Sequence, residues 1–322
     1  MTPDRRHHQG QRFRNLNPAF TAPSARERVA FVASRMWATA FHPRSSPLVP
    51  IDNDGERVRK NATLPTVTWI GHATLLVQLD GLNVLTDPHW SERASPVSFA
   101  GPKRLVAPGL PFDRLPPIHV VVISHDHYDH LDLATVRRLA GAHAPRFVVP
   151  LGAKRWFADR GIGRVEEYDW WDTEQIDGVA FTCVPVQHFS GRTLWDQNRR
   201  LWCGWAMQGR HRHFLFAGDT GYHQALFTEI AKRLGPVDVA AVPIGAYLPP
   251  AIMRYVHSTP EQAVQIFSDL GASRLLAMHW GTFDLADEPI AEPPKRLEAE
   301  AQRVGLSDDR VWIMRPGETK GW

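Results

Sequence analysis

The hexapeptide His125-Asp-His-Tyr-Asp-His130 concentrates imidazole and carboxylate side chains in one short stretch. It follows the apolar run of residues 119–124 and precedes residues 131–139, so a buried strand leads through it into a helix, with Asp132 as the expected N-cap. A loop at the carboxyl end of a strand can hold such groups in a cleft without burying their charge in the core. These donors together suit zinc and its first-row neighbours, so the stretch predicts a metal site.

Three later segments repeat this arrangement, in which an apolar strand ends in a residue able to bind a metal. They are residues 179–188, 213–219 and 274–279. Taken singly, each terminal His or Asp is more often structural, and the hexapeptide alone would suit a solvated loop. Taken together, they complete a two-metal site. We expect one metal on His125, His127 and His188, a second on Asp129, His130 and His279, and Asp219 bridging both.

The sequence resembles the metallo-β-lactamase-fold hydrolases, whose H-x-H-x-D-H motif, distal His, bridging Asp and final His occur here in the same order. Further motifs, from about residue 66 to the end, are similar to the N-acylphosphatidylethanolamine-hydrolysing phospholipase D family in its bacterial-type members. They include Trp69-Ile-Gly-His-Ala-Thr74, Leu85-Thr-Asp-Pro88, Ala217-Gly-Asp-Thr-Gly-Tyr222, Pro243-Ile-Gly-Ala-Tyr247 and His279-Trp-Gly-Thr-Phe283. The resemblance implies an α+β fold, the αββα sandwich of the metallo-β-lactamase type.

Bulk composition agrees with one large soluble protein. The 322 residues can bury a large core, and contents of 43% hydrophobic and 22% charged residues are ordinary. The net charge of +3 is too weak to predict nucleic-acid binding, although it favours approach to anionic phosphate or lipid. Without a signal peptide or a membrane-spanning apolar run, we expect a cytoplasmic location, with peripheral membrane contact left open. Cys183 and Cys203 lie in apolar runs and are expected to be buried thiols.

The chain divides by composition into a basic arm with an amphipathic helical segment, residues 1–50, and a hydrolase domain, residues 51–322. The polar, basic start predicts a disordered or surface-hugging arm. A helix is expected over residues 25–41, because four apolar residues recur at helical spacing. Packing of this apolar face on the domain is the favoured interpretation, and contact with lipid is the alternative. The four residues are Val29, Val32, Met36 and Trp37.

Strands and helices then alternate along the domain. The Asp80-Gly81 pair between apolar strands predicts a hairpin, and residues 95–117 predict a long irregular loop at the cleft wall. Thr259 is expected to cap a helix that begins at Pro260. Strands are expected at 66–70, 74–79, 146–150, 201–207, 213–216 and 237–242, and helices at 153–159, 223–234, 259–270 and 295–304.

Two metals held close together predict hydrolysis without a protein nucleophile. Each zinc lowers the pKa of bound water toward ~7, so a metal-bridging hydroxide can attack a bound phosphodiester at neutral pH. No Gly-x-Ser-x-Gly nucleophile elbow occurs in the sequence. Asp129 is expected to bind the second ion and to relay a proton, and Asp219 to hold the metal spacing. We expect two zinc ions, with iron or manganese as alternatives, because His and carboxylate ligands admit all three.

Five further residues are candidates for the site. By resemblance, His257 positions the substrate or protonates the leaving group, and the alternative is a helix-entry His without contact. His72 and Asp87 lie at strand ends and are candidates to orient the metal ligands, with a turn or a buried polar role as the alternative. Tyr222 and Tyr247 are candidate cleft-lining residues.

The resemblance implies a zinc-dependent phosphodiesterase that hydrolyses N-acylphosphatidylethanolamine to N-acylethanolamine and phosphatidic acid. The alternative is a related metal-dependent hydrolase of a soluble ester, lactone or phosphodiester. An apolar cleft favours the lipid, and a small polar cleft favours the alternative. A non-catalytic metal- or nucleic-acid-binding protein is a third hypothesis, opposed by the complete ligand set and the scattered basic residues. We therefore expect a phospholipid or other phosphodiester substrate and no nucleic acid, and leave a homodimer open.

Overall fold

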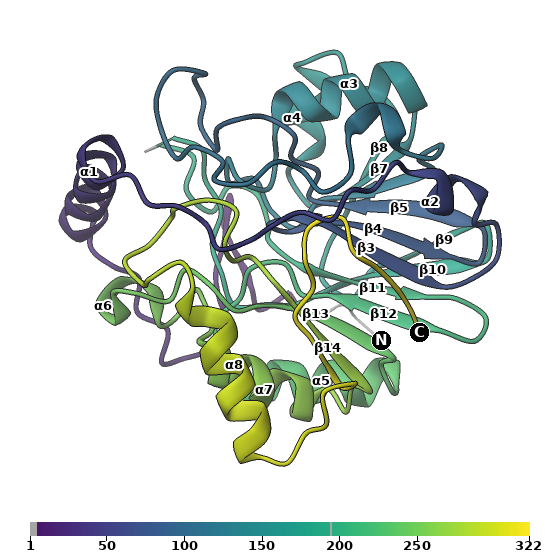
Figure 1. Cartoon of the computed structure of the whole chain (residues 1–322). Helices are drawn as coiled ribbons and strands as arrows, with labels where there is room; N and C mark the ends of the chain where they lie inside the picture. The colour runs from purple at the N-terminus through teal and green to yellow at the C-terminus, as the bar shows by residue number, and fades with distance from the viewer. Residues whose placement is uncertain (1–4, 194) are drawn as a thin grey trace.

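Two seven-stranded sheets lie face to face, and helices cover their outer faces (Figure 1). This computed structural model describes residues 5–193 and 195–322. The layers form the expected αββα sandwich, so the architecture implied by the resemblance is confirmed. Within the described part of the chain, no helix combines the length and the apolar character needed to cross a bilayer.

The first sheet is antiparallel at one side and parallel at the other. β3 and β5 are both antiparallel to β4, so β3 runs in the same direction as β5 and as β6, which is parallel to β5. The strand order is β16 (Thr319–Gly321), β3 (Thr66–Gly71), β4 (Thr74–Leu79), β5 (Leu82–Thr86), β6 (Val120–Val122), β7 (Arg146–Pro150) and β8 (Val165–Tyr168).

The second sheet is built in the same mixed manner. β12, β13 and β14 are parallel, and β10 shares their direction because β10 and β12 are both antiparallel to β11. The strand order is β15 (Val311–Trp312), β14 (Arg274–Met278), β13 (Val239–Pro243), β12 (His213–Phe216), β11 (Gly204–Gln208), β10 (Val179–Val184) and β9 (Thr173–Ile176).

Successive residues of the buried strands pack on opposite faces. In β6, Val120 and Val122 belong to the same apolar cluster as Trp205 of the second sheet, whereas Val121 packs in the cluster that contains Val136 of α3. This alternation follows from the two-residue period of a strand. Because both faces are covered, the strand is apolar throughout.

Helices cover both outer faces of the sandwich. α3 (Leu133–His143) and α4 (Lys154–Ala158) lie on the first sheet, and α5 (Gln224–Leu234), α7 (Pro260–Asp269) and α8 (Glu292–Arg303) lie on the second (Figure 1). The predicted caps are present: Asp132 accepts from the Ala134 amide, and Thr259 forms a capping box with Gln262. The remaining elements are β1 (His8–Gln9), β2 (Arg12–Phe13), α2 (Glu56–Lys60), the 3-10 helix η1 (Phe112–Arg114) and α6 (Pro250–Met253).

The expected hairpin and buried thiols are both present. Asp80 and Gly81 connect β4 to β5 with φ values of +48° and +84°, the left-handed conformation that a two-residue turn of this kind requires. Cys183 and Cys203 are free and buried, as expected.

The helix predicted over residues 25–41 is present as α1 (Ala25–Phe41), but its orientation differs from the favoured interpretation. A capping box between Ser24 and Glu27 begins the helix, and Arg35 ties it to Asp284 and Asp287. The expected packed face is exposed instead, with Trp37 58% exposed. The prediction of packing was wrong for this face, because the helix lies beside the sandwich (Figure 1) and leaves these four side chains largely exposed. The exposed residues are Val29, Val32, Met36 and Trp37.

The arm before α1 lies on the domain surface. Phe13 is buried, and its amide donates to the Asn198 carbonyl oxygen at 2.8 Å. The His7 and His8 rings lie 2.6 and 2.7 Å from the Asp169 carboxylate, which anchors β1. Of the two expectations for the arm, the surface-hugging one therefore describes the residues from His7 onward. The division of the chain at residue 50 stays a prediction.

Candidate metal centre and substrate cavity

Strands that share a direction bring the predicted ligands to one end of the sandwich. In the first sheet, Asp87 follows β5 and the hexapeptide follows β6. In the second sheet, His188, Asp219 and His279 follow β10, β12 and β14. Because all these strands end at the same edge, residues separated by more than 150 positions meet in one place.

One group of donors consists of three imidazoles. Nε2 of His125 lies 2.8 Å from Nδ1 of His127, and Nε2 of His188 lies 3.3 Å from the same Nδ1 atom. Oδ2 of Asp219 lies 3.9 Å from the His125 nitrogen and 3.8 Å from the His188 nitrogen. The structure therefore brings together the residues predicted for the first metal.

A second group lies on the other side of the Asp219 carboxylate. Nε2 atoms of His130 and His279 are 3.1 Å apart, and each is 3.1 Å from Oδ2 of Asp219. Oδ2 of Asp129 is 3.3 Å from the His130 nitrogen and 3.4 Å from the His279 nitrogen. Asp219 is thus the residue shared between the two groups, as a bridging ligand would be.

The electrostatics of these groups suit cations. Burial lowers the pKa values of His125 and His188 well below the ordinary range, which keeps both imidazoles neutral and able to bind a metal. Burial also acts to lower the pKa of His279, but the carboxylates of Asp219 and Asp129 outweigh it and raise that pKa to about 9. The carboxylates therefore draw positive charge to this point, which a metal ion would supply.

The Asp219 carboxylate supplies a further test of the fit. Its Oδ1 atom is buried and has no hydrogen-bond partner among the described residues. A buried carboxylate oxygen is costly to leave unpaired, and a metal ion would satisfy it. The donors therefore fit metal ions, while the number and identity of the ions stay predictions.

Three hydrogen bonds orient the imidazoles from outside. Oδ2 of Asp87 lies 2.7 Å from Nδ1 of His130, and Oγ of Ser124 lies 2.8 Å from Nδ1 of His125. Nδ1 of His188 lies 2.8 Å from the Val256 carbonyl oxygen. Each contact leaves Nε2 facing the centre, the usual arrangement around a metal. Asp87 therefore lies where its predicted orienting role requires.

His72 connects two of the predicted ligands. Its Nε2 atom lies 2.9 Å from Oδ2 of Asp129, and its carbonyl oxygen accepts from the His279 amide at 3.1 Å. Its backbone occupies the left-handed region with φ of +54°, held by a hydrogen bond from its amide to Thr282 Oγ1 at 2.8 Å. This unusual backbone conformation lets one residue contact both ligands.

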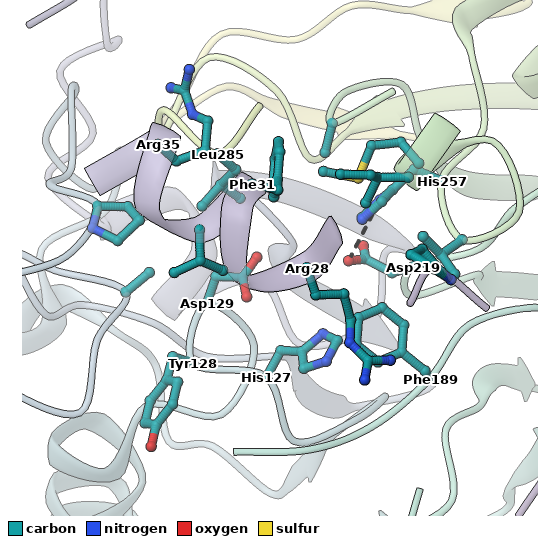
Figure 2. Close-up of a pocket in the computed structure, with 18 of the residues that line it drawn as sticks. Arg28, Phe31, Arg35, His127, Tyr128, Asp129, Phe189, Asp219, His257 and Leu285 are labelled. Atoms are coloured by element: carbon teal, nitrogen blue, oxygen red, sulfur yellow. Dashed lines mark ion pairs between the residues drawn. The ribbon is translucent and has the colours of Figure 1, made fainter. Parts of the chain in front are cut away.

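His257 also faces the centre, where it lies close enough to His188 and Asp219 to form a further group able to hold a metal ion. Its Nδ1 atom is 3.9 Å from Oδ2 of Asp219 and has no hydrogen-bond partner among the described residues (Figure 2). Burial lowers its pKa to about 4, so the imidazole is neutral at neutral pH. The structure places His257 where it can contact a substrate, and its catalytic role stays a prediction.

A cavity of about 460 Å³ opens above the donors. His127, Asp129, Asp219, His257 and His279 contribute to its floor, and α1 passes across it (Figure 2). Pro102, in the loop predicted to form a cleft wall, also lines it. The other walls are largely apolar, from Phe20, Phe31, Val32, Met36, Phe189, Ile252, Met253, Val256 and Leu285.

Neither tyrosine expected at the cleft lines this cavity, so that expectation is corrected. The Tyr222 hydroxyl donates to Asp269 at 2.8 Å, and the Tyr247 hydroxyl donates to Glu292 at 2.7 Å. Both carboxylates draw the phenol rings away from the site. Tyr128, within the hexapeptide, lines the cavity instead.

The arm contributes a contact that sequence reasoning missed. Asn15 Nδ2 donates to the His188 carbonyl oxygen at 2.7 Å, and the His188 amide donates to Asn15 Oδ1 at 3.1 Å. Asn17 similarly donates to the Gln187 side chain at 2.7 Å. A polar arm without periodicity carries no signal for such pairing, so only the folded chain shows that the arm holds a predicted metal ligand in place.

Comparisons with known proteins identify the family. Residues 82–280 match the Beta-lactamase superfamily domain. The chain is 43% identical over 263 residues to the N-acyl-phosphatidylethanolamine-hydrolyzing phospholipase D 1 of Caenorhabditis elegans, with 78% of this chain and 74% of the relative covered. It is 41% identical over 312 residues to an uncharacterized protein of Mycobacterium tuberculosis, with 95% and 82% covered.

A solved structure supports the same fold. The metallo hydrolase Igni18 of Ignicoccus hospitalis matches with a TM-score of 0.62 and 21% identity, over 81% of this chain and 99% of that one. The expected fold and the class of enzyme are thereby confirmed. The chain is a metal-dependent hydrolase that belongs to the beta-lactamase superfamily and, within it, to the family of the N-acyl-phosphatidylethanolamine-hydrolyzing phospholipases D.

Proposed function

We propose that this protein is a zinc-dependent phosphodiesterase that hydrolyses N-acylphosphatidylethanolamine to N-acylethanolamine and phosphatidic acid. The observation that carries the proposal is the apolar cavity directly above the metal-binding groups. Relatives from Caenorhabditis elegans and Saccharomyces cerevisiae, 43% and 34% identical, bear the name of this activity.

The cavity walls distinguish a lipid from a small polar substrate. Phe31, Phe189 and Ile252 line the same space as His257 and Asp219, so apolar walls rise directly from the polar floor. A hydrocarbon chain would cover these walls and remove their apolar surface from water, at about 25 cal/mol per Å². A small polar ester would leave much of that surface wet, so the walls favour a lipid.

Three exposed aromatic side chains support access from a lipid surface. Phe41 of α1, Phe99 and Trp195 are 68%, 81% and 80% exposed. Exposed aromatic side chains favour the boundary between lipid and water, and an amphipathic helix can lie in that boundary. We therefore include peripheral membrane contact in the proposal, with α1 as the element that touches lipid.

The residues around the centre have separate roles in the proposed reaction. When bound, zinc would supply Lewis acidity and a water activated at neutral pH. The two groups of donors would hold the ions, with Asp219 common to both. His257, neutral and with an unpaired Nδ1 atom, would hydrogen-bond the phosphodiester, while the apolar walls hold the acyl chain.

Product analysis tests this proposal. Zinc-loaded protein is incubated with N-acylphosphatidylethanolamine in mixed micelles, beside the Asp219→Ala variant, and the products are identified by mass spectrometry. We expect N-acylethanolamine and phosphatidic acid from the parent protein alone. Absence of both products, with zinc measured in the protein, would overturn the lipid substrate and favour a soluble ester, lactone or phosphodiester.

A further inference from the structure

A second cavity, of about 480 Å³, adjoins the metal loop. Its walls come mainly from residues 91–93 and 95–98, from the first two turns of α3 and from the residues around α4. Tyr128 lines this cavity as well as the substrate cavity, so one side chain lies between them. In Figure 2 its ring points away from the Asp129 carboxylate. The second cavity is therefore a neighbour of the metal centre and separate from it.

Guanidinium groups dominate the charge of this second cavity. Four arginines line it, and none of them lies within ion-pair distance of a carboxylate in the described ranges. The nearby Arg200, by contrast, pairs with both Asp126 and Asp196. Guanidinium groups that donate to backbone carbonyl oxygens but have no carboxylate partner, gathered around one hollow, are a feature of sites that bind anions. The four residues are Arg93, Arg137, Arg160 and Arg192.

Two of these groups are held rigidly. Arg192 donates to the carbonyl oxygens of Asp126 and Leu131 at 2.8 and 2.9 Å, and its Cζ atom stacks 3.9 Å from the Tyr128 ring centroid. The Trp156 ring lies 4.2 Å from Cζ of Arg160 and 5.1 Å from Cζ of Arg192. Such fixed guanidinium groups lose little freedom when they bind a ligand.

The carboxylates at the cavity are already engaged. Asp132 accepts from the Ala134 and Ser91 amides at 3.2 and 3.1 Å, and Glu92 pairs with Lys103 at 2.8 Å. The four arginines and these two carboxylates give the lining residues a net charge of +2. Burial lowers the pKa of Arg192, although the nearby Tyr128 and Asp126 act to raise it.

We propose that this cavity binds a phosphate monoester. The guanidinium group matches phosphate in shape and charge, and a phosphate dianion would balance the net charge of the lining. The volume of about 480 Å³ leaves room for an organic group attached to the phosphate. A soluble metabolite and the headgroup of a phosphatidate share this chemistry. The site does not depend on which bond the metal centre hydrolyses.

Calorimetric titration of the metal-loaded protein with glycerol 3-phosphate tests the site. The test variant is Arg137→Gln/Arg160→Gln, in which Arg137 is exposed and Arg160 only half-buried. The matched control is Arg138→Gln/Arg155→Gln, which removes the same charge from α3 and α4 outside the cavity. We expect Kd to rise about 100-fold in the test variant, about tenfold for each guanidinium removed, and to stay unchanged in the control.

Each outcome decides the proposal. Phosphate bound at the metal centre would give the same affinity in all three proteins, and that result would overturn the second site. Binding to phosphatidylcholine vesicles, with and without phosphatidate, distinguishes a lipid headgroup from a soluble phosphate monoester as the ligand. If only phosphatidate vesicles bind, and only the test variant loses them, the site takes a lipid headgroup. If neither probe responds to the test substitutions, the cavity does not bind phosphate.

Discussion

A single oxygen atom of Asp219 lies between the two groups of predicted metal ligands. Oδ2 lies within 3.9 Å of Nε2 in His125, His130 and His279. Burial acts to raise the pKa of Asp219, but the neighbouring imidazoles of His130 and His279 outweigh it and keep the pKa well below the ordinary range. The carboxylate is therefore ionised. An ionised, buried carboxylate shared between two sets of possible metal ligands is the strongest single reason to expect two ions here.

The Asp219→Ala variant should lose metal and activity together. Without the shared oxygen, both groups of donors lack a ligand. Metal affinity should therefore fall by more than the roughly 10- to 100-fold expected when a residue that only hydrogen-bonds a ligand is removed. Elemental analysis and product assay on the same preparation check this. Retention of two tightly bound metals per chain would contradict the bridging role.

Asp87→Asn should weaken metal binding without removing a ligand. The carboxylate orients His130 through Nδ1 at 2.7 Å and accepts from the Ser124 amide at 2.7 Å. We expect metal affinity to fall about 10- to 100-fold, measured by competition with a chelator. Asn83→Asp, near the opposite end of β5 and outside the centre, serves as the control for an exchange between carboxylate and amide in this strand. Unaltered affinity in Asp87→Asn would assign Asp87 a purely structural role.

His257→Ala should preserve metal content and lower turnover. The side chain lines the cavity and is not one of the predicted metal ligands, so we expect its loss to remove a substrate contact and to leave the metal in place. A contribution of general acid–base type is worth about 10²- to 10⁴-fold in rate. Steady-state kinetics at measured metal content check the prediction, and an unchanged kcat would remove His257 from the catalytic residues.

At the scale of elements, α1 lines the cavity with one face and exposes apolar side chains to solvent on another. Phe31 faces the cavity, while Val29 and Trp37 are exposed to solvent on another face. The periodicity of the sequence correctly predicts the helix, yet it cannot say which apolar face meets protein. That choice depends on where the helix lies beside the sandwich, which the ion pairs of Arg35 with Asp284 and Asp287 help to set.

The double variant Val29→Ser/Trp37→Ser should weaken binding to phospholipid vesicles. Each side chain that enters the lipid boundary contributes up to about 1.5 to 3 kcal/mol, which corresponds to roughly tenfold or more in affinity. Vesicle co-sedimentation measures this, with circular dichroism to confirm folding. Leu64→Ser is the control, since Leu64 is 68% exposed and lies between α2 and β3, far from α1 (Figure 1). Equal binding by all variants would contradict lipid contact through α1.

At the scale of the whole molecule, the metal-binding residues connect the two sheets. The hexapeptide extends from β6 of the first sheet, whereas His188, Asp219 and His279 extend from strands of the second. A metal bound by both sets would hold the two halves of the sandwich together at this edge. Stability and metal occupancy are therefore expected to be linked.

Removal of the metal by a chelator should lower the melting temperature by several degrees. A ligand at 1,000 times its Kd stabilises the folded state by about 4 kcal/mol, because it binds that state alone. Each kcal/mol corresponds to about 2–4 °C in a domain of 150–250 residues. Thermal unfolding with and without chelator checks this, and Asp219→Ala should show a much smaller shift. An identical melting temperature in both conditions would contradict a metal shared between the sheets.

The sequence alone determined most of the central strands and the side chains that follow them, whereas β9, β15 and β16 were not predicted. A two-residue period, a 3.6-residue period and a capping residue are local properties, so β4, α3 and α7 could be predicted closely. The types of metal ligand could also be predicted, because His and Asp residues that follow four different strands are rarely found together except at a metal site. Only the assembled sheets, however, bring those ends within hydrogen-bonding distance.

The tertiary structure decided everything that depends on contacts between distant segments. Asn15 meets His188 across 173 positions, and the hydroxyls of Tyr222 and Tyr247 turn to Asp269 and Glu292 instead of the cleft. The exposed face of α1 and the unpaired arginines of the second cavity belong to the same class of fact. Such contacts leave no periodic trace in the chain, because they arise from the way the packed elements cross and cover one another.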